Sequence, residues 1–438
     1  MGEATDKASV AGFVEEVLDG SGWELSRVKR RSSRLEPPDS YWTLFDIAIN
    51  KDEEERRLRL VAKGALNPAA WERLSSQLVV HGGEDRRCDP IGGLGYPKLF
   101  PESKHAYWFY PFDPAMPGLS EAADPVRMAR LLVGLDGDNT SDILSVARRL
   151  EIERVRYMPE ISAILRYRLD SPAAPVDIYG KVQPGNRGLR TNRIVNALWQ
   201  ASKNHPGYLK LPRQLGFVDH LGLLLEERVP GLPVSGHRAN TEFRHLGHAA
   251  AEALAVIHES KIEVDAVINI EHELARLDRV AEQFTYVLPT GHFLLTDLIA
   301  HMRDRLRKTQ MEEILPTHGD LKYDQFIHHN GEFTLIDFDY FAMAETSYDL
   351  GKFCAYTVPS TPRDWRESVA AEETRASFIQ RYMELRPGAT LQRFAVYEAL
   401  QLALRAMAAM WSQSSGWERV AETFLVMAFE RLKTRLPG

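Results

Sequence analysis

The residues that most constrain the fold of this chain lie between positions 317 and 341, where a short acidic β-hairpin is predicted. The Asn-Gly pair at 330–331 is a strong two-residue turn signal between the apolar runs QFI and FTLIDF. Asp320 and Gln325 come just before the first strand, and Asp337 comes at the end of the second. Because the two strands of a hairpin are antiparallel, these residues are expected to meet at its open end.

This group of side chains suits a hard cation. Mg²⁺ takes oxygen ligands and usually keeps water molecules and substrate phosphates in the rest of its coordination shell. A further carboxylate beside such a cation can accept the proton of a hydroxyl nucleophile. Together these groups serve phosphoryl transfer, in which catalysis is mostly positioning and neutralisation of charge.

The composition is that of an ordinary soluble globular protein. Of 438 residues, 44% are hydrophobic and 26% are charged, and the formal net charge is −7. A general nucleic-acid binder is expected to carry a basic excess or a basic stripe, and this sequence shows neither. We therefore expect no nucleic-acid partner.

Several features of the sequence point to a reducing compartment. The start, MGEATDKAS, has neither the basic nor the apolar region of a signal peptide. Cys88 and Cys354 cannot by themselves form a disulfide framework or a cysteine zinc site. The most apolar long stretch, residues 394–411, contains a Glu, a Gln and an Arg and is not expected to span a bilayer. The sequence predicts a cytoplasmic protein with no membrane partner.

The first half of the chain repeats one order of predicted elements: a hairpin, a helix, a second hairpin and an exit loop. The first copy comprises residues 41–50, 57–63, 68–78 and 97–119, and the second comprises residues 161–169, 176–182, 191–202 and 212–232. The last segments of the two copies match in an opening Pro-basic pair, a central His and a closing Pro-Gly-Leu. The pattern predicts an internal duplication. The alternative is that two generic antiparallel meanders are alike in composition only.

From residue 241 onward the apolar spacing is helical. We therefore predict four parts of the chain. They are an N-terminal α+β unit (1–123), a helical linker (124–150), a second β-rich unit (151–232) and a helical part (233–438) that contains the hairpin at 317–341.

The motifs around the hairpin resemble those of a known family. Residues 318–320 (HGD), Gln325 and residues 336–338 (IDF) resemble the H-G-D-x-x-x-x-N…I-D-F pattern of aminoglycoside phosphotransferase-like and choline kinase-like small-molecule kinases. Residues 348–350 (YDL) and 254–258 (LAVIH) match further motifs of these kinases, in the same order along the chain. The resemblance implies an α+β, protein-kinase-like bilobal fold. Its β-rich N-lobe would be residues 151–232 and its helical C-lobe residues 233–438, with the N-terminal unit as a candidate duplicate of the N-lobe.

The resemblance also implies roles for the residues of the hairpin. Asp320 would be the base that orients the acceptor hydroxyl, and Lys322 would lie near the transferred phosphate. Gln325 and Asp337 would hold Mg²⁺. Gln325 stands where the family usually has Asn and adds one methylene group, which is expected to shift the metal position.

On the nucleotide side, the resemblance requires a strand lysine that reaches the phosphates of ATP. Lys181 fits this role better than Lys63, because one helix and one hairpin separate Lys181 from the helical part. The alternative for Lys63 is a solvated strand lysine. Tyr157 lies in the turn expected to cover the nucleotide with its backbone N–H groups, although this turn lacks the usual glycines. Glu226 and Arg228 lie in the segment expected to meet the adenine edge.

One departure from the family pattern concerns the helix predicted at 191–202. This helix lacks the Glu that should orient the strand lysine, and there is no acidic residue between Lys181 and Asp219. Either an amide or an acid from another part of the fold would then orient Lys181.

For the acceptor, the candidate residues lie near the hairpin and on a C-terminal helix. Asp324 and Asp339 are extra acids close to the catalytic loop, and Glu398, Arg405 and Trp411 lie on the helix predicted at 391–413. Carboxylates and aromatic rings suit an amino-sugar or a quaternary amine. The alternative is that the last three are core side chains and ordinary helix pairs.

The sequence thus predicts an enzyme: a phosphotransferase that uses ATP and Mg²⁺ to phosphorylate a hydroxyl of a small molecule. The candidate acceptors are sugars, amino-sugars, aminoglycoside-like antibiotics and amino-alcohols. The alternative is a nucleotide-binding, kinase-like regulatory or scaffold protein, which the missing helix Glu would favour. A protein-substrate kinase is disfavoured, because no A-P-E motif follows Asp337.

Overall fold

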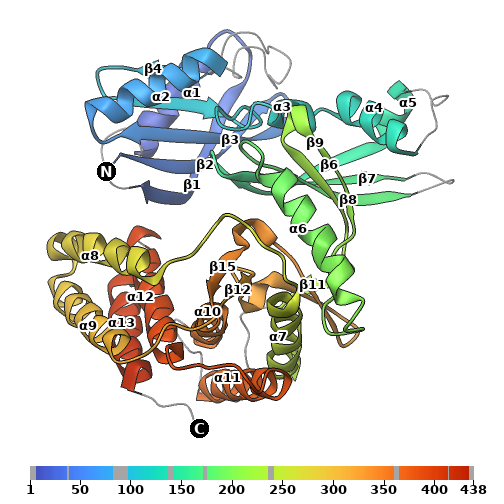
Figure 1. Cartoon of the computed structure of the whole chain (residues 1–438). Helices are drawn as coiled ribbons and strands as arrows, with labels where there is room; N and C mark the ends of the chain where they lie inside the picture. The colour runs from blue at the N-terminus through green and yellow to red at the C-terminus, as the bar shows by residue number, and fades with distance from the viewer. Residues whose placement is uncertain are drawn as a thin grey trace. The chain divides into compact units, whose positions relative to one another are not determined.

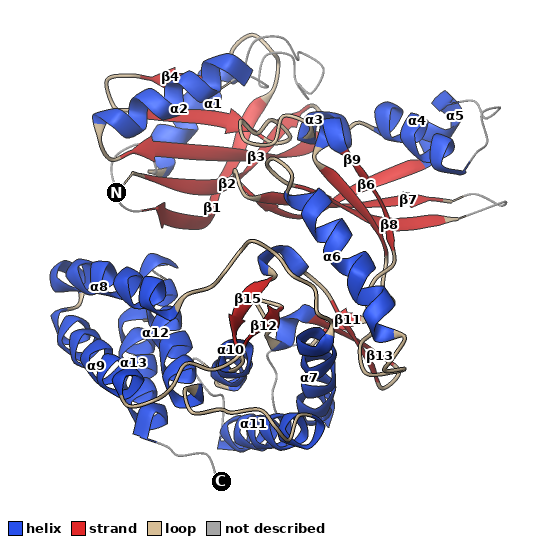
Figure 2. Ribbon diagram, viewed as in Figure 1, coloured by secondary structure: helices blue, strands red, loops and turns tan. Residues whose placement is uncertain are grey.

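The computed structural model divides the chain into two compact units. The first comprises Met1–Leu189 and Leu215–Glu227, and the second comprises Arg190–Gln214 and Arg228–Gly438. The residues that the structure describes are 6–36, 39–81, 97–136, 143–170, 175–234, 241–359, 365–412 and 414–433. Figure 2 shows that strands dominate the first unit and helices the second, so the predicted α+β fold class, β-rich first and helical afterwards, is confirmed.

The first unit begins with a five-stranded antiparallel sheet in the order β1-β2-β3-β5-β4 (Figure 1). Its strands are β1 (Glu24–Glu36), β2 (Ser40–Lys51), β3 (Glu54–Ala65), β4 (Lys98–Phe100) and β5 (His105–Phe109), and its helices are α1 (Lys7–Leu18) and α2 (Pro68–His81). Side chains on β2 are buried on both faces, because Phe45 and Ile47 pack in one core with α1 while Trp42 and Leu44 pack in another. This two-sided burial explains why the sequence of β2 is apolar without strict alternation.

The second sheet of this unit also has five antiparallel strands, in the order β6-β7-β8-β10-β9. They are β6 (Leu150–Met158), β7 (Ser162–Leu169), β8 (Val176–Val182), β9 (Gln214–Val218) and β10 (Leu223–Glu227). Helix α6 (Arg187–Ser202) lies between β8 and β9 in the chain, as α2 lies between β3 and β4. The two sheets therefore have the same strand order and the same place for their helix.

The register of the strands shows that the similarity between the two five-stranded sheets extends to single residues. Lys63 on β3 pairs with Trp42 and Ala106, and Lys181 on β8 pairs with Ile164 and Leu224. The number of residues between Lys63 and its partner Ala106 on β5 equals the number between Lys181 and its partner Leu224 on β10. The predicted duplication is thus supported by topology and register, and the two lysines occupy equivalent positions.

The predicted match between two histidines of the copies is wrong. His105 begins β5, whereas His220 lies in the short 3-10 helix η3 (Asp219–Leu221) before β10. By register, the equivalent of His105 is Leu223, the first residue of β10. The two histidines share only a place near the middle of similar segments, and strand pairing, which sets equivalence, puts them at different positions.

Helices α3 (Leu119–Ala122), α4 (Pro125–Asp136) and α5 (Ile143–Arg149) connect the two sheets. Met128, Leu132 and Val146 from the predicted linker pack in the same core as Trp108 of the first sheet and Leu165 of the second. One continuous core therefore joins both sheets, and the connecting segment is part of it.

The second unit is mostly helical. Its helices are α7 (Thr241–Glu259), α8 (Ile270–Val287), α9 (Pro289–Arg307), α10 (Ser347–Thr357), α11 (Trp365–Leu385), α12 (Phe394–Ser412) and α13 (Trp417–Lys433). Helix α12 is buried on nearly all sides, which explains why it is the most apolar long stretch of the sequence. Among the described residues, no helix combines the length and the hydropathy needed to cross a membrane. Cys354 is buried, and Cys88 lies outside the described residues.

Two small sheets interrupt these helices. One contains β11 (Leu232–Pro233), β13 (Phe326–His329) and β14 (Glu332–Leu335), and the other contains β12 (Ile314–Thr317) and β15 (Ala342–Glu345). The segment between β12 and β15 holds the acidic hairpin, close to α10 in the sequence and in the fold (Figure 1).

Candidate active site

The hairpin in the second unit forms as predicted. Phe326 on β13 pairs with Leu335 on β14, and Asn330 and Gly331 make the turn. Both turn residues have positive φ, 50° and 83°, which is the requirement that makes Asn-Gly a favoured hairpin turn.

The open end of this hairpin brings three predicted site residues together. Nε2 of Gln325 lies 3.0 Å from Oδ2 of Asp320 and 3.4 Å from Oδ2 of Asp337. Gln325 ends the 3-10 helix η4 (Tyr323–Gln325), and Asp337 is the cap of η5 (Phe338–Tyr340). Two carboxylates and an amide, from the segments before the first strand and after the second, thus meet at the open end of the hairpin.

Asp320 is held by two ammonium groups. Nζ of Lys322 lies 3.0 Å from its Oδ2, and Nζ of Lys352 lies 2.8 Å from its Oδ1. Burial raises the pKa of Asp320, but the charges of Lys352 and Lys322 outweigh burial and leave this pKa below its ordinary value. The carboxylate is therefore ionised at neutral pH. This state is required of a group that accepts a hydrogen bond from an attacking hydroxyl.

Lys352 was not predicted from the sequence. It lies on α10 and also donates to the backbone oxygen of Gly319 at 2.9 Å, so it holds both the side chain of Asp320 and the backbone of the loop at 318–325. The feature of the sequence that could have indicated Lys352 is its position three residues after Asp349, just beyond the YDL motif. Spacing alone did not show that this helix packs against the loop.

The backbone of the loop is fixed by Asp349, which is fully buried. Its Oδ2 accepts hydrogen bonds from Thr317 Oγ1 at 2.5 Å, His318 N at 2.7 Å and Gly319 N at 3.2 Å. The ring of His318 packs on Phe338 and lies 3.1 Å from the backbone oxygen of residue 336. These contacts connect the start of the loop to α10 and to the end of the hairpin.

Two positions of this loop have left-handed backbones. Gly319 has φ of 80°, and a Cβ atom there would lie 2.0 Å from the backbone oxygen of Tyr340, so only glycine fits. Asp337 has φ of 70°, which is uncommon for a residue other than glycine. Such a conformation at a non-glycine residue persists where the surrounding structure enforces it, which occurs often at functional sites.

The donor set fits Mg²⁺ bound in the usual way. Among the residues that the structure describes, no group of three or more His, Cys, Asp or Glu side chains forms a complete metal cage. Mg²⁺ does not need such a cage, since one or two carboxylates combine with waters and substrate phosphates. In the structure the amide nitrogen of Gln325 contacts both carboxylates, and the oxygen of the same amide is the atom that would bind a cation.

The two extra acids near the loop have different surroundings. Asp324 is about half exposed, and its Oδ1 lies 3.9 Å from Nζ of Lys322. Asp339 accepts a hydrogen bond from Oγ1 of Thr191 on α6 at 3.2 Å. The next residue, Tyr340, has 61% of its surface exposed.

The three candidate acceptor residues on α12 have partners inside the protein. Glu398 is fully buried and binds Arg375 through two hydrogen bonds of 2.7 Å. Arg405 donates to the backbone oxygens of Ala355 and Val358, and Trp411 donates to Gln283. These contacts hold Glu398 and Trp411 among the helices around α12. The guanidinium of Arg405 also lies 5.0 Å from the centre of the Tyr356 ring, and Nζ of Lys322 lies 5.6 Å from the same ring.

The residues predicted to bind the nucleotide lie mostly in the first unit. Lys181 and Glu226 lie on the adjacent strands β8 and β10, and Arg228 begins the second segment of the second unit. Tyr157 is buried, and its hydroxyl donates to Oδ2 of Asp113 at 2.8 Å. Tyr157 therefore contacts the first copy of the repeat through its side chain.

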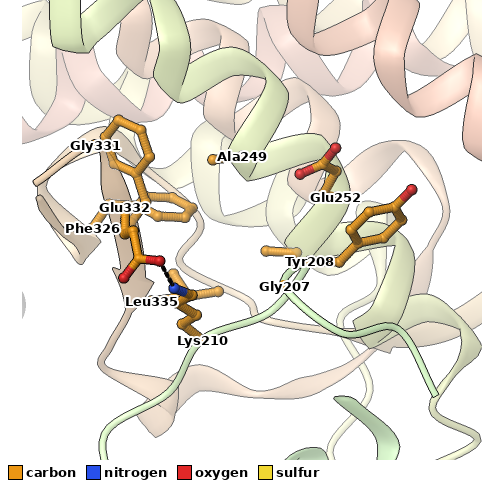
Figure 3. A pocket seen from close by; sticks show the side chains of 11 residues that line it. Gly207, Tyr208, Lys210, Ala249, Glu252, Phe326, Gly331, Glu332 and Leu335 are labelled. Carbon is orange, nitrogen blue, oxygen red and sulfur yellow. Dashed lines mark ion pairs between the residues drawn. The ribbon is translucent and has the colours of Figure 1, made fainter. Parts of the chain in front are cut away.

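A cavity of about 220 Å³ lies elsewhere in the second unit (Figure 3). Tyr208, Lys210, Glu252 and Phe333 are among the side chains that line it, and Lys210 forms an ion pair with Glu332 at its edge. None of the predicted site residues lines this cavity.

Comparison of the sequence with protein families gives one match. The model of the phosphotransferase enzyme family, APH, matches residues 197–387, which include the loop at 318–325 and the hairpin. The predicted resemblance to aminoglycoside phosphotransferase-like and choline kinase-like enzymes is thereby confirmed. This match supports a small-molecule phosphotransferase. No curated protein sequence matches the chain.

Several solved structures are similar to the chain at low identity. A choline kinase from Cryptosporidium parvum Iowa II is 10% identical, with 69% of this chain and 95% of that one covered and a TM-score of 0.49. A glucosamine kinase in complex with glucosamine, ADP and phosphate is 15% identical, with coverage of 68% and 87% and a TM-score of 0.47. A spectinomycin phosphotransferase in complex with ADP and spectinomycin is 12% identical, with coverage of 65% and 88% and a TM-score of 0.44.

Proposed function

We propose that this chain, whose residues 197–387 match the phosphotransferase enzyme family, transfers the γ-phosphate of ATP to a hydroxyl group of a small molecule. The observation that carries the proposal is the convergence of Asp320, Gln325 and Asp337 at the open end of one hairpin. The candidate acceptors are sugars, amino-sugars, aminoglycoside-like antibiotics and amino-alcohols.

In the proposed reaction the acceptor oxygen forms a bond to the γ-phosphorus, and the bond from that phosphorus to the bridging oxygen of ADP breaks. The hydroxyl proton passes to Asp320, which also orients the hydroxyl before attack. The lowered pKa of Asp320 makes it a weak base. This suits a loose transition state, in which the hydroxyl loses its proton late and positioning contributes most.

The two lysines on Asp320 have different parts in this proposal. Lys352 binds Asp320 and the backbone oxygen of Gly319, so it keeps the carboxylate in place throughout. Lys322 binds Asp320 and lies near the more exposed Asp324. Lys322 is therefore the one that can turn to the transferred phosphoryl group, whose negative charge would attract it.

Asp337 and Gln325 are the proposed holders of Mg²⁺, which when bound would neutralise charge on the phosphate oxygens. The left-handed backbone of Asp337 fixes the direction of this carboxylate relative to the hairpin. The extra methylene of Gln325 is accommodated, because its amide still reaches both carboxylates.

On the nucleotide side we propose that Lys181 contacts the phosphates, with Glu226 and Arg228 near the adenine. The equivalent Lys63 is bound to carboxylates of the first unit, Glu160 and Glu36, so it is not the phosphate ligand in this proposal.

For the acceptor we propose Asp324, Asp339 and the exposed ring of Tyr340. We assign Glu398, Arg405 and Trp411 to the helical core.

The test is release of ADP from Mg·ATP with a panel of amino-sugars, sugars, aminoglycosides and amino-alcohols. The variant Asp320→Asn should lose acceptor-stimulated release by at least about 100-fold while it still binds Mg·ATP. The matched control is Asp304→Asn on α9, which breaks an exposed ion pair with Lys308 and should leave the rate unchanged. Full activity of Asp320→Asn would contradict the role of the base. Binding of Mg·ATP without release for any acceptor would favour a regulatory nucleotide-binding protein.

A further inference from the structure

Lys63 on β3 and Lys181 on β8 occupy equivalent positions in the two sheets, so the contacts of Lys63 indicate which part of the second sheet Lys181 reaches. In the first sheet, Nζ of Lys63 lies 3.8 Å from Oε2 of Glu36, the last residue of β1. A lysine at this position therefore reaches the turn between the first two strands of its own sheet. By the same register, Lys181 is directed toward the turn at 158–162 of the second sheet. Phosphates bound by Lys181 would lie against that turn.

This turn carries a carboxylate. Glu160 has φ of 59° and forms an ion pair with Lys63, and the two side chains are only 15% and 12% exposed. Without Lys63, the charge of Glu160 would repel a triphosphate next to the turn, and partial burial would strengthen that repulsion. The lysine of the first copy thus neutralises the acid on the turn of the second copy.

The backbone of the turn is also bound to the first copy. The N–H group of Glu160 donates to Oδ2 of Asp113 at 2.9 Å, and the same oxygen accepts from the hydroxyl of Tyr157. Asp113 is 1% exposed and follows β5 in the chain. The N–H group of Ile161 donates to the oxygen of Met158 at 3.1 Å. The N–H of Ile161 thus closes the turn on itself, and the N–H of Glu160 ties the turn to Asp113 of the first copy.

We infer that the first sheet serves the nucleotide site of the second, with Lys63 as a positioning residue that neutralises Glu160 and holds the turn at 158–162 against the phosphates. The inference rests on the proposed function, because it assumes that Lys181 binds phosphates. It explains why the first copy keeps a lysine at the position equivalent to Lys181 and holds that lysine in a partly buried ion pair. It also implies that each chain binds one nucleotide.

The experiment measures the affinity of the full chain for Mg·ATP by calorimetry, in the wild type and in five variants. Lys63→Met should weaken binding about tenfold, and Lys63→Arg should restore most of it. Glu160→Gln should stay within about twofold of the wild type, and the double variant Lys63→Met/Glu160→Gln should recover affinity, because the turn then carries no charge that repels the phosphates. Glu36 keeps its hydrogen bonds from Ser40 and Trp42 in this variant. The matched control is Arg59→Met on the same strand, which breaks an ion pair with Asp46 and should leave affinity within about twofold.

Two results would overturn the inference while the proposed function stands. One is a Lys63→Met affinity equal to that of Arg59→Met, in a wild type that binds Mg·ATP and phosphorylates an acceptor. The other is a double variant as weak as Lys63→Met alone. Binding of two nucleotides per chain would also overturn it, since the first sheet would then hold its own site. A wild type that binds no Mg·ATP would contradict the proposed function and the inference together. If Lys63→Met fails to fold, the Arg and double variants still decide the outcome.

Discussion

At the scale of single residues, the site depends on side chains that hold other side chains. Asp320 has Lys352 on one oxygen and Lys322 and Gln325 on the other, so little freedom remains for its rotation. The burial of Lys352 lowers its pKa, but Tyr348 and Asp320 outweigh burial and raise this pKa above its ordinary value. Lys352 is therefore a permanent cation, and its contribution to the proposed reaction would be geometric and electrostatic.

We predict that Lys352→Met lowers kcat about 10- to 100-fold, because Asp320 loses the partner that fixes its orientation. The KM for ATP should change little, since Lys352 contacts Asp320, Gly319 and the ring of Tyr348. Lys352→Arg should restore part of kcat. Steady-state kinetics check this, with Lys308→Met as the control on an exposed ion pair. A kcat equal to that of the control would refute the role of Lys352.

At the scale of elements, buried ionic contacts connect strands and helices that are far apart in the sequence. Asp113, after β5, binds the end of β6 and the turn that follows it. Glu398 on α12 binds Arg375 on α11. In both cases a charge is buried and its partners come from another element, so a change in one partner affects the packing of both elements.

The buried carboxyl of Asp113 predicts a particular dependence of stability on pH. Burial raises its pKa to about 6, against the opposing effect of hydrogen bonds from Glu160 and Tyr157. A raised pKa means that the folded state binds more protons than the unfolded state between about pH 4 and 6, so the contribution of Asp113 to stability falls as pH rises through this window. The total loss is about 3 kcal/mol.

Denaturant unfolding at pH 4 and pH 7 of the wild type and Asp113→Asn measures this effect. The substituted amide has no proton to lose, so the free energy of unfolding of the wild type relative to the variant should decrease by about 2–3 kcal/mol between the two pH values. A difference between the two proteins that stays constant with pH would show that Asp113 is ionised throughout.

The Glu398–Arg375 pair predicts the result of a test of the acceptor side. Glu398→Gln should reduce the free energy of unfolding by about 3–5 kcal/mol, because the charge of Arg375 is left buried and uncompensated. The KM of the acceptor should not change if Glu398 belongs to the core as we propose. Thermal unfolding and kinetics with the identified acceptor check both statements. A raised KM for the acceptor with unchanged stability would show that Glu398 belongs to the acceptor site and not to the core.

At the scale of the whole molecule, the chain has two units, and the first contains both five-stranded sheets. The core between these sheets includes Trp108, which is fully buried and donates a hydrogen bond to the hydroxyl of Tyr157. Because one core is shared, we expect the two sheets to unfold together and not as separate domains.

Trp108→Ala tests this cooperativity, since removal of a fully buried Trp costs about 3–5 kcal/mol. Hydrogen exchange followed by mass spectrometry should show that peptides from β2 and β3 and peptides from β7 and β8 all lose protection. Loss of protection in the first sheet alone would show that the copies are independent domains. Peptides from α12 and α13 in the second unit are the internal control.

The sequence by itself determined the features that depend on local physics. The Asn-Gly turn supplies two residues that readily take positive φ, and with the apolar runs on both sides it predicts that Asp320 and Asp337 lie at one end of a hairpin. The helical periodicity after residue 241 and the order of strands in each copy are local in the same sense. The α+β character and the group formed by Asp320, Gln325 and Asp337 follow from these features, and the kinase-like arrangement was implied by the family resemblance.

Only the tertiary structure decided which partners these residues have. Lys352 follows the hairpin in the sequence, and its contact with Asp320 exists because α10 packs against the loop. Lys63 and Glu160 lie in different copies of the repeat, and Glu398 on α12 is paired inside the protein. Such contacts depend on how separate elements pack, and neither periodicity nor a turn signal contains that information.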